Sequence, residues 1–283
     1  NGSVNFYKEV VYAQSEYIFW GKHHTSLDAD VGAAAGTLGN AFSHATNLPM
    51  YSSLAGGTDD NAPTDGELQT GFAKFANDEA VDVSLIPTGA VSATVSKYVV
   101  ENVAEVRKDC MVFISPELAD AQSSTPATDI KDFRTTQNIN SSFAVMDSGY
   151  KYQFDRYNDV FRYVPLNGDV AGCLVRTDLV ADPFFSPAGF NRGQIKNAVK
   201  LAYSPDKADR DTLYKNAINP VVSFPGQGTV LFGDKTMLSA PSAFDRINVR
   251  RLFIILEKAI ATAAKFQLFE FNDTFTRANF RNL

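Results

Sequence analysis

The fold of the second half of the chain is decided by residues 219–233, which read NPVVSFPGQGTVLFG. Two short apolar runs flank the dipeptide Pro225-Gly226. Proline presets the backbone for the second position of a tight turn, and glycine accepts the positive φ that a type II turn requires at its third position. The stretch therefore predicts a β-hairpin over 219–233, with a turn built by Pro225, Gly226 and Gly228.

A long helix is predicted directly after this hairpin. Residues 242–253 read SAFDRINVRRLF, and apolar side chains then recur at intervals of three to five residues. They are Ile247, Leu252, Ile255, Leu256, Ala259 and Ile260. This spacing predicts a helix over 248–264 that turns one broad apolar face toward a core.

The two pieces together resemble the C-terminal region of contractile-tail sheath proteins. The resemblance lies in the order Asn-Pro, Phe-Pro-Gly-Gln-Gly, Phe-Gly and Arg-Ile-Asn-Val-Arg-Arg-Leu-Phe within 219–253. Shorter upstream pieces follow in the order that the family shows: Trp20-Gly21-Lys22, Gly56-Gly57-Thr58-Asp59, Val81-Asp82-Val83 and 167–172. The resemblance covers most of the chain. The family comprises the sheaths of T-even-like myophages and of related contractile injection systems.

The resemblance implies a structural protein and not an enzyme. Subunits of this family polymerise around a tail tube, and the sheath contracts to drive the tube through the host envelope. The implied partners are other copies of the chain, the tail tube protein, the baseplate and the tail terminator. The implied location is the phage tail of the virion, after assembly in the host cytoplasm, and no cofactor is implied.

Composition is that of an ordinary globular protein. The chain has 283 residues, of which 45% are hydrophobic and 20% charged, with a formal net charge of −6. The negative balance argues against a nucleic-acid partner, and no apolar run is long enough to insert in a membrane. Cys110 and Cys173 are the only cysteines and lie in apolar runs, so we expect two buried free thiols.

Both ends of the sequence look cut. The chain begins at Asn1 without a methionine, and it ends inside a predicted helix with Asn272 as its N-cap. We therefore expect a piece of a longer protein. In the resembling family, terminal arms add strands to neighbouring subunits, so we expect residues 1–283 alone to be monomeric.

The first half of the chain predicts an α/β unit. Strands are expected at 81–86, 110–114 and 142–146, with a valine-lined helix over 91–106 between the first two. A strand, a helix and a strand of this length imply parallel pairing. Further strands are expected at 150–155 and 160–164, a buried helix from 170, and a capping box at Thr64-Asp65-Gly66-Glu67.

Other segments give weaker patterns. Residues 1–16 predict an edge strand or a linker, residues 26–62 a long loop, and residues 118–140 at most one short helix. Ser204-Pro205 is predicted to open a helix, and 266–271 to form a strand. Residues 195–203 fit either a strand or a short helix.

The predicted fold class is α/β in two parts. By the resemblance, residues 1–185 form a subtilisin-like parallel-sheet domain that is truncated at its N-terminal side. Residues 186–283 form a smaller, truncated α+β C-terminal domain around the hairpin and the long helix. We place the boundary in 182–193, which holds two prolines and two glycines.

No catalytic site is predicted. In subtilisin-like proteases the nucleophilic serine opens a central helix, but here Asn167-Gly168-Asp169 occupies that region. A triad also needs a histidine base, and the three histidines, His23, His24 and His44, lie in or beside the early loop. The resemblance therefore implies the subtilisin-like fold but not proteolytic activity.

No metal or phosphate site is predicted either. Asp59, Asp60, Asp65 and Glu67 could bind a hard cation, but a solvated loop and a helix N-terminus explain them better. His23 and His24 are adjacent, so on a strand they point to opposite faces. Gly226-Gln227-Gly228 lacks the lysine of a phosphate loop, and a hairpin turn explains it.

A basic side of the long helix is the candidate partner-binding surface. It consists of Arg246, Arg250, Arg251 and Lys258. An ordinary solvated face and a docking surface for an acidic partner both fit, and by the resemblance that partner is the tail tube. Two other functions stay open, an α/β hydrolase-like enzyme and a scaffold that does not contract.

Overall fold

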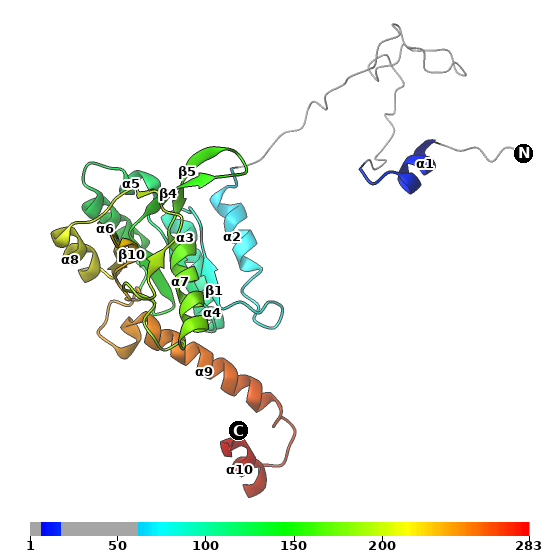
Figure 1. Cartoon of the computed structure of the whole chain (residues 1–283). Coiled ribbons are helices and arrows are strands. Elements are labelled where there is room, and N and C mark those ends of the chain that lie inside the picture. The colour runs from blue at the N-terminus through cyan, green and yellow to red at the C-terminus, as the bar shows by residue number, and fades with distance from the viewer. Residues whose placement is uncertain (1–6, 18–61, 283) are drawn as a thin grey trace, which may run out of the picture. The chain divides into compact units, whose positions relative to one another are not determined.

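A computed structural model describes residues 7–17 and 62–282 of the chain (Figure 1). The chain divides into two compact units, 1–61 and 62–283. In the first unit the described element is α1 (Tyr7–Gln14). The expectation of a strand or linker over 1–16 is therefore wrong for these residues, since Tyr7, Val10 and Val11 stand at helical spacing. The predicted loop over 26–62 lies outside the described residues, except for Ala62.

The second unit is an α/β fold around a four-stranded parallel sheet (Figure 1). Its strands run in the order β1 (Leu85–Pro87), β2 (Met111–Ile114), β3 (Ala144–Asp147) and β8 (Ile218–Asn219). All three pairings are parallel. The predicted strands at 110–114 and 142–146 and their parallel sense are confirmed, while β1 covers only the end of the predicted 81–86.

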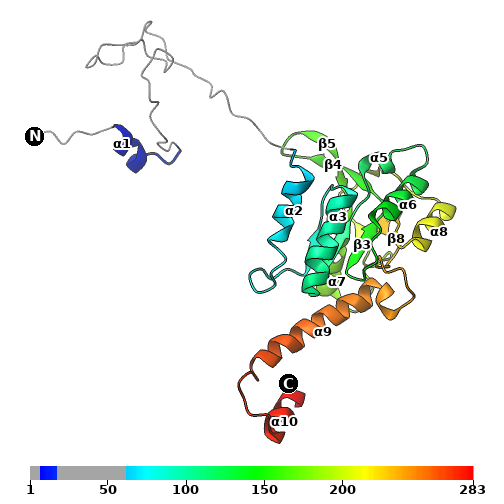
Figure 2. The same cartoon turned by 180° about the vertical axis from the view of Figure 1, so that it is seen from behind.

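Alternating side chains of the sheet supply two hydrophobic cores. Val112 and Ile114 point to one face, where they pack with Val95, Val99 and Ile130. That face is covered by α3 (Ala93–Val99), α6 (Pro126–Gln137) and α8 (Lys207–Lys215), as Figure 2 shows from behind. The helix α2 (Asp65–Ala73) packs against the same core with Leu68 and Phe72.

The opposite face of the sheet carries a second core. Met111 and Phe113 pack there against Leu174 of α7 (Asn167–Val180). Val221 and Ile254 join the same core from the second half of the chain. Strands buried on both faces are expected to read as continuous apolar runs, which is why they were predictable.

The predicted helix over 91–106 forms, but with a wider turn inside it. It consists of α3, a π-helical segment η1 (Val100–Ala104) and α4 (Glu105–Arg107). Val95, Val99 and Val103 repeat every four residues and are all fully buried. An α-helix has 3.6 residues per turn, so side chains spaced by four residues gradually rotate away from one face of the helix. The wider π-helical turn offsets this rotation and keeps the three valines on the same face.

The predicted hairpin is present as β9 (Val221–Phe224) and β10 (Gly228–Leu231). Gly226 has a φ of 76°, and the Gln227 backbone N–H donates to the Phe224 carbonyl at 3.1 Å. β10 also pairs with β6 (Gln194–Ile195). A third sheet contains β5 (Val160–Pro165), β4 (Tyr150–Asp155) and β7 (Lys200–Leu201).

Several local predictions are wrong. Residues 118–140 hold two helices, α5 (Leu118–Ala121) and the twelve-residue α6, because a mostly polar segment buries Ile130 and Phe133. The helix predicted from Ser204 begins at Lys207 with Asp206 as its N-cap, since Ser204 Oγ instead accepts from the Ser223 backbone N–H at 3.3 Å.

The C-terminal segment also differs from expectation. α9 (Ile247–Lys265) forms as predicted, but only Ile247, Arg251 and Ile254 are buried, and Ile260 keeps 56% of its surface exposed. The helix projects beyond the sheet in both views (Figures 1 and 2), so the core reaches only its first turns. The strand predicted over 266–271 is wrong: these residues form turns and a bend before α10 (Thr274–Asn282), and none of the described sheets includes them.

Residues 62–283 cluster as one compact unit. Strand β8 from the second half of the chain pairs with β3 from the first half. A domain boundary at 185/186 therefore stays a prediction.

The side chain of Asn219 holds three segments together, which makes it a test of the fold. It donates to the Met146 carbonyl at 3.0 Å and to the Lys235 carbonyl at 2.8 Å, and it accepts from the Lys235 N–H at 2.7 Å. We expect Asn219→Ala to lower the free energy of unfolding by roughly 2–4 kcal/mol, because buried partners lose their hydrogen bonds. Chemical denaturation measures this. Asn216→Ala, at the exposed end of α8, is the control, and an equal loss in both variants would contradict the prediction.

Gly226 tests the hairpin turn. No atom lies within 4 Å of a Cβ built at this position, so a substitution there meets backbone strain and not a clash. We expect Gly226→Val to destabilise the protein by roughly 1–3 kcal/mol. Gly226→Asn should lose less, since asparagine tolerates positive φ. Thermal melts of both variants compare them, and equal melting temperatures for Val, Asn and wild type would count against a strained turn.

Candidate functional site

The carboxyl ends of β1, β2 and β3 are the first place to look for chemistry, because ligands of open α/β sheets bind at this edge. Thr88, Ser115 and Asp147 follow or end these strands, and Asn167 begins α7 beside them. All four residues are buried, with exposed fractions of 6% or less. This is the region in which the sequence suggested the helix start of a subtilisin-like fold.

These residues form a closed hydrogen-bond network. The Ser115 hydroxyl donates to Asp147 Oδ2 at 2.7 Å, and the Asn167 backbone N–H donates to Ser115 Oγ at 3.0 Å. Asn167 Nδ2 donates to the Gly89 carbonyl at 2.7 Å. The network links three strand ends to α7.

Burial raises the pKa of Asp147 to about 8, against hydrogen bonds from Gly149 and Ser115 that lower it. No cation is paired with this carboxyl among the described residues. The described ranges also contain no histidine, since His23, His24 and His44 lie outside them. Ser115 therefore has no histidine base beside it in the described part of the chain, and the carboxyl group that it contacts, Asp147, is held in its neutral form by burial. The network acts as a structural link.

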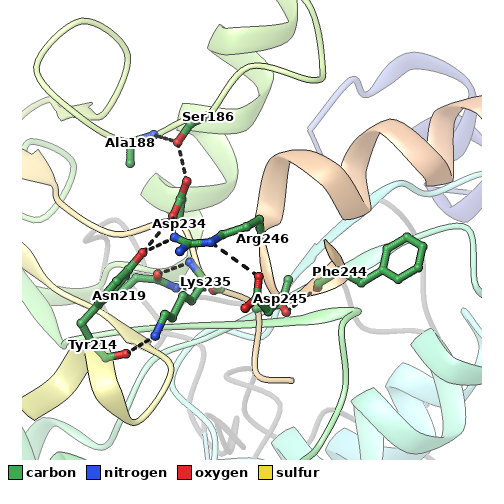
Figure 3. A network of polar contacts seen from close by, with 10 residues as sticks. Ser186, Ala188, Tyr214, Asn219, Asp234, Lys235, Phe244, Asp245 and Arg246 are labelled. Atoms are coloured by element: carbon green, nitrogen blue, oxygen red, sulfur yellow. Dashed lines mark hydrogen bonds and ion pairs between the residues drawn. The ribbon is translucent and has the colours of Figure 1, made fainter. Parts of the chain in front are cut away.

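A second polar network fixes the start of α9 (Figure 3). Arg246 Nη1 donates to Asp234 Oδ1 at 2.7 Å and also contacts the Tyr214 hydroxyl. Tyr214 OH donates to Asp234 Oδ1 at 3.0 Å, and Ser186 Oγ donates to Asp234 Oδ2 at 3.1 Å. The hydrogen bond to Asp234 raises the pKa of Arg246, so this guanidinium stays charged. The network joins α8, the loop after β10 and α9.

The other predicted basic residues are also engaged within the chain. The Arg250 guanidinium lies 4.4 Å from the ring centroid of Phe143 and 4.0 Å from that of Phe244. Arg251 is only 8% exposed, and its Nη2 donates to Asp178 Oδ2 of α7 at 2.7 Å. Lys258 contacts Asp82 and lies 3.8 Å from Asp109 Oδ2.

The structure thus brings Arg246, Arg250, Arg251 and Lys258 onto one helix but gives each an intramolecular partner. Arg246 and Lys258 keep 43% and 34% of their side-chain surfaces exposed. The sequence could not reveal the partners Tyr214, Asp234 and Asp178, because they lie 12 to 73 positions away. Binding of an external partner by these residues stays a prediction.

The acidic segment holds a helix cap. The Thr64–Glu67 capping box is confirmed, with the Thr64 N–H donating to Glu67 Oε2 at 2.7 Å. Asp65 accepts from the Ser92 hydroxyl at 2.7 Å, and Asp59 and Asp60 lie outside the described residues. Within 7–17 and 62–282, no cluster of three metal-ligating side chains occurs, and no helix is long and apolar enough to cross a membrane.

Comparison with known proteins identifies the family. The family described as "Phage tail sheath protein central domain" matches residues 61–237 of the chain. The chain belongs to the phage tail sheath protein family. The tail sheath protein of Vibrio phage KVP40 is 45% identical over 251 residues, which are 81% of this chain and 37% of that protein. The tail sheath protein of Enterobacteria phage T4 is 45% identical over 263 residues, which are 85% of this chain and 40% of that protein.

The chain spans about two fifths of the length of these tail sheath relatives. Among solved structures, the anti-feeding prophage helical sheath in the contracted state is similar with a TM-score of 0.59. It is 18% identical, and the match covers 81% of this chain and 58% of that one. At this identity the likeness shows a shared fold.

The buried carboxyl of Asp147 gives a pH-dependent prediction. The folded protein keeps this proton up to pH about 8, while the unfolded chain loses it near the ordinary value of 3.8. The contribution of the protonated Asp147 carboxyl group to the free energy of unfolding is therefore complete below pH about 4, and it is lost as the pH rises to about 8. Over this pH range we expect the free energy of unfolding of the Asp147→Asn variant to rise relative to that of the wild type, by at most about 1.4 kcal/mol per pH unit.

Urea denaturation at a series of pH values from 4 to 9 measures this difference. Asp211→Asn removes an exposed carboxylate of α8 outside the network and serves as the control. Parallel pH profiles for wild type and Asp147→Asn would show that Asp147 is ionised in the folded protein.

Proposed function

We propose that this chain is part of a structural subunit of a contractile phage tail sheath. The observation that carries the proposal is the match to two phage tail sheath proteins at 45% identity over more than four fifths of the chain. The parallel-sheet core is consistent with it, because the strands and helices that form the core fall inside the matched family range or follow it directly.

Within this proposal, residues 1–185 belong to a subtilisin-like domain, and residues 186–283 form a smaller α+β domain. The parallel sheet and the position of Asn167 at the start of α7 support the first part. The hairpin and α9 support the second. The domain serves as a rigid body and not as an enzyme, since Asn167 stands where such proteases carry their serine.

The proposed mechanism needs neither a nucleotide nor a metal. Subunits polymerise around the tail tube in a long metastable state and contract when their contacts rearrange. Partners are further copies of the chain, the tail tube protein, the baseplate and the tail terminator, and the location is the virion. The similar structures, a contracted helical sheath and a baseplate of the anti-feeding prophage, support these roles. That residues 1–283 alone stay monomeric is part of the proposal.

The tube-facing surface is proposed to lie on the basic side of α9. Arg246 and Lys258 keep enough exposed surface to meet an acidic partner. Arg250 and Arg251 contribute by fixing the helix against Phe143 and Asp178. Exposed charges of this kind act mainly on the rate and register of docking.

A domain exchange tests the function. The aligned 263 residues of the T4 tail sheath protein would be replaced by the matching residues of this chain. We expect the chimera to assemble on T4 tails as an extended sheath and to contract, as seen by electron microscopy.

The same exchange carrying Asn219→Ala is the control for a misfolded insert. A soluble, folded chimera that never coats the tube would contradict the proposal, and a coat that forms but never contracts would favour the scaffold alternative. Labelling of the chain by a fluorophosphonate probe would instead favour a hydrolase.

A further inference from the structure

A pocket of about 430 Å³ lies where the ends of α6 and α8 meet the loop after β10. Its lining includes Arg134 and Asn138 from α6 and its end, Lys215 from α8, and Lys235 and Asp245 from the later segments. The family match assigns no role to this pocket, and Arg134 and Lys215 take part in neither of the polar networks described above.

Arg134 is a buried cation without a counter-charge. It is 9% exposed, and its Nη2 donates to the Met237 carbonyl at 3.0 Å. Its Nε is buried and has no hydrogen-bond partner, and no carboxylate among the described residues pairs with the guanidinium. Burial lowers the pKa of Arg134, and no opposing charge offsets this effect. A buried guanidinium without a carboxylate costs free energy, and an anion in the pocket that Arg134 lines would offset that cost.

The other basic side chains of the lining, Lys215 and Lys235, also lack a carboxylate partner. Lys215 is exposed and makes no ion pair within the described part of the chain. Lys235 Nζ donates to the Tyr214 carbonyl at 2.9 Å and lies 4.3 Å from the Tyr214 ring centroid, so it also has no carboxylate. The acidic side chain in the lining, Asp245, is paired with Arg246 at 3.5 Å.

Helix ends explain part of this arrangement. α6 and α8 both end at the pocket, and their last carbonyls carry partial negative charge that favours cations nearby. This accounts for Lys215 in the last turn of α8. It also favours Arg134, which lies in the last turn of α6, but it supplies no carboxylate. The Met237 carbonyl, which lies outside both helices, is the one acceptor that the Arg134 guanidinium reaches among the described residues.

We propose that this pocket binds a carboxylate group, with the Arg134 guanidinium as its central donor and Lys215 and Lys235 at its sides. The planar fork of guanidinium N–H groups matches a carboxylate better than an ammonium group does. The volume accommodates a small polycarboxylate or an acidic side chain of a second copy of this chain. Neither sheath assembly nor contraction is required for this site.

Calorimetric titration with citrate at constant ionic strength tests the site. We expect saturable binding of one citrate per chain. Arg134→Gln should weaken it about tenfold or more, and Lys215→Gln about threefold. Lys207→Gln, which removes an exposed lysine from the other end of α8, should leave it unchanged. If circular dichroism shows that Arg134→Gln does not fold, the comparison of Lys215→Gln with Lys207→Gln decides.

Sedimentation velocity distinguishes the two sources of the carboxylate. Association of the wild type that is reversed both by citrate and by Arg134→Gln assigns the pocket to an acidic side chain of a second copy. A monomer that binds citrate at every concentration assigns it to a free polycarboxylate. Absence of saturable citrate binding together with absence of Arg134-dependent association would overturn the proposal, as would equal weakening by Lys207→Gln.

Discussion

The pairing of β8 with β3 is the interaction on which the rest of the second unit depends. Only two residues of β8 pair, Ile218 with Met146 and Asn219 with Asp147. Ile218 is fully buried in the first core, and the Asn219 side chain makes three further hydrogen bonds. Through this short strand, the hairpin, the loop after β10 and α9 are positioned on a sheet formed earlier in the chain. The close fit extends to Gly233, where an added Cβ would lie 2.9 Å from Asn219 Oδ1.

The position of α9 follows from this constraint. The Lys235 backbone N–H donates to Asn219 Oδ1, which fixes the position of this loop. The adjacent Asp234 then binds Arg246 at the start of the helix. Arg251 adds a second link, to Asp178 of α7. The helix is therefore fixed at its first turns and again at Lys258, which contacts Asp82, while Leu256 and Ile260 remain open to solvent. The exposed apolar side chains of this helix are suitable for contacts with a neighbouring molecule in the proposed sheath.

The basic side chains at α9 stabilise the fold through contacts within the chain. Three of the four basic side chains predicted to face a partner pair with carboxylates of the same chain, and the fourth lies between two aromatic rings. Arg134 differs from these four side chains, because its buried guanidinium has neither a carboxylate nor an aromatic ring beside it among the described residues. An uncompensated buried cation costs stability unless a partner neutralises it. This contrast is what separates the proposed carboxylate pocket from the basic face of α9.

The sequence by itself determined the local elements and the family. Continuous apolar runs predicted β2 and β3, Pro225-Gly226 predicted the hairpin, and Thr64 with Glu67 predicted the start of α2, because each depends on neighbouring residues. The residues of 219–253 also carried the resemblance to sheath proteins. Only the tertiary structure decided which faces are covered. It assigned α6 to the core despite its polar sequence, left most of α9 exposed, and brought Asn219, Asp234 and Arg246 to partners distant in sequence. Burial and long-range pairing depend on how segments meet in space, and the spacing of residues along one segment does not contain that information.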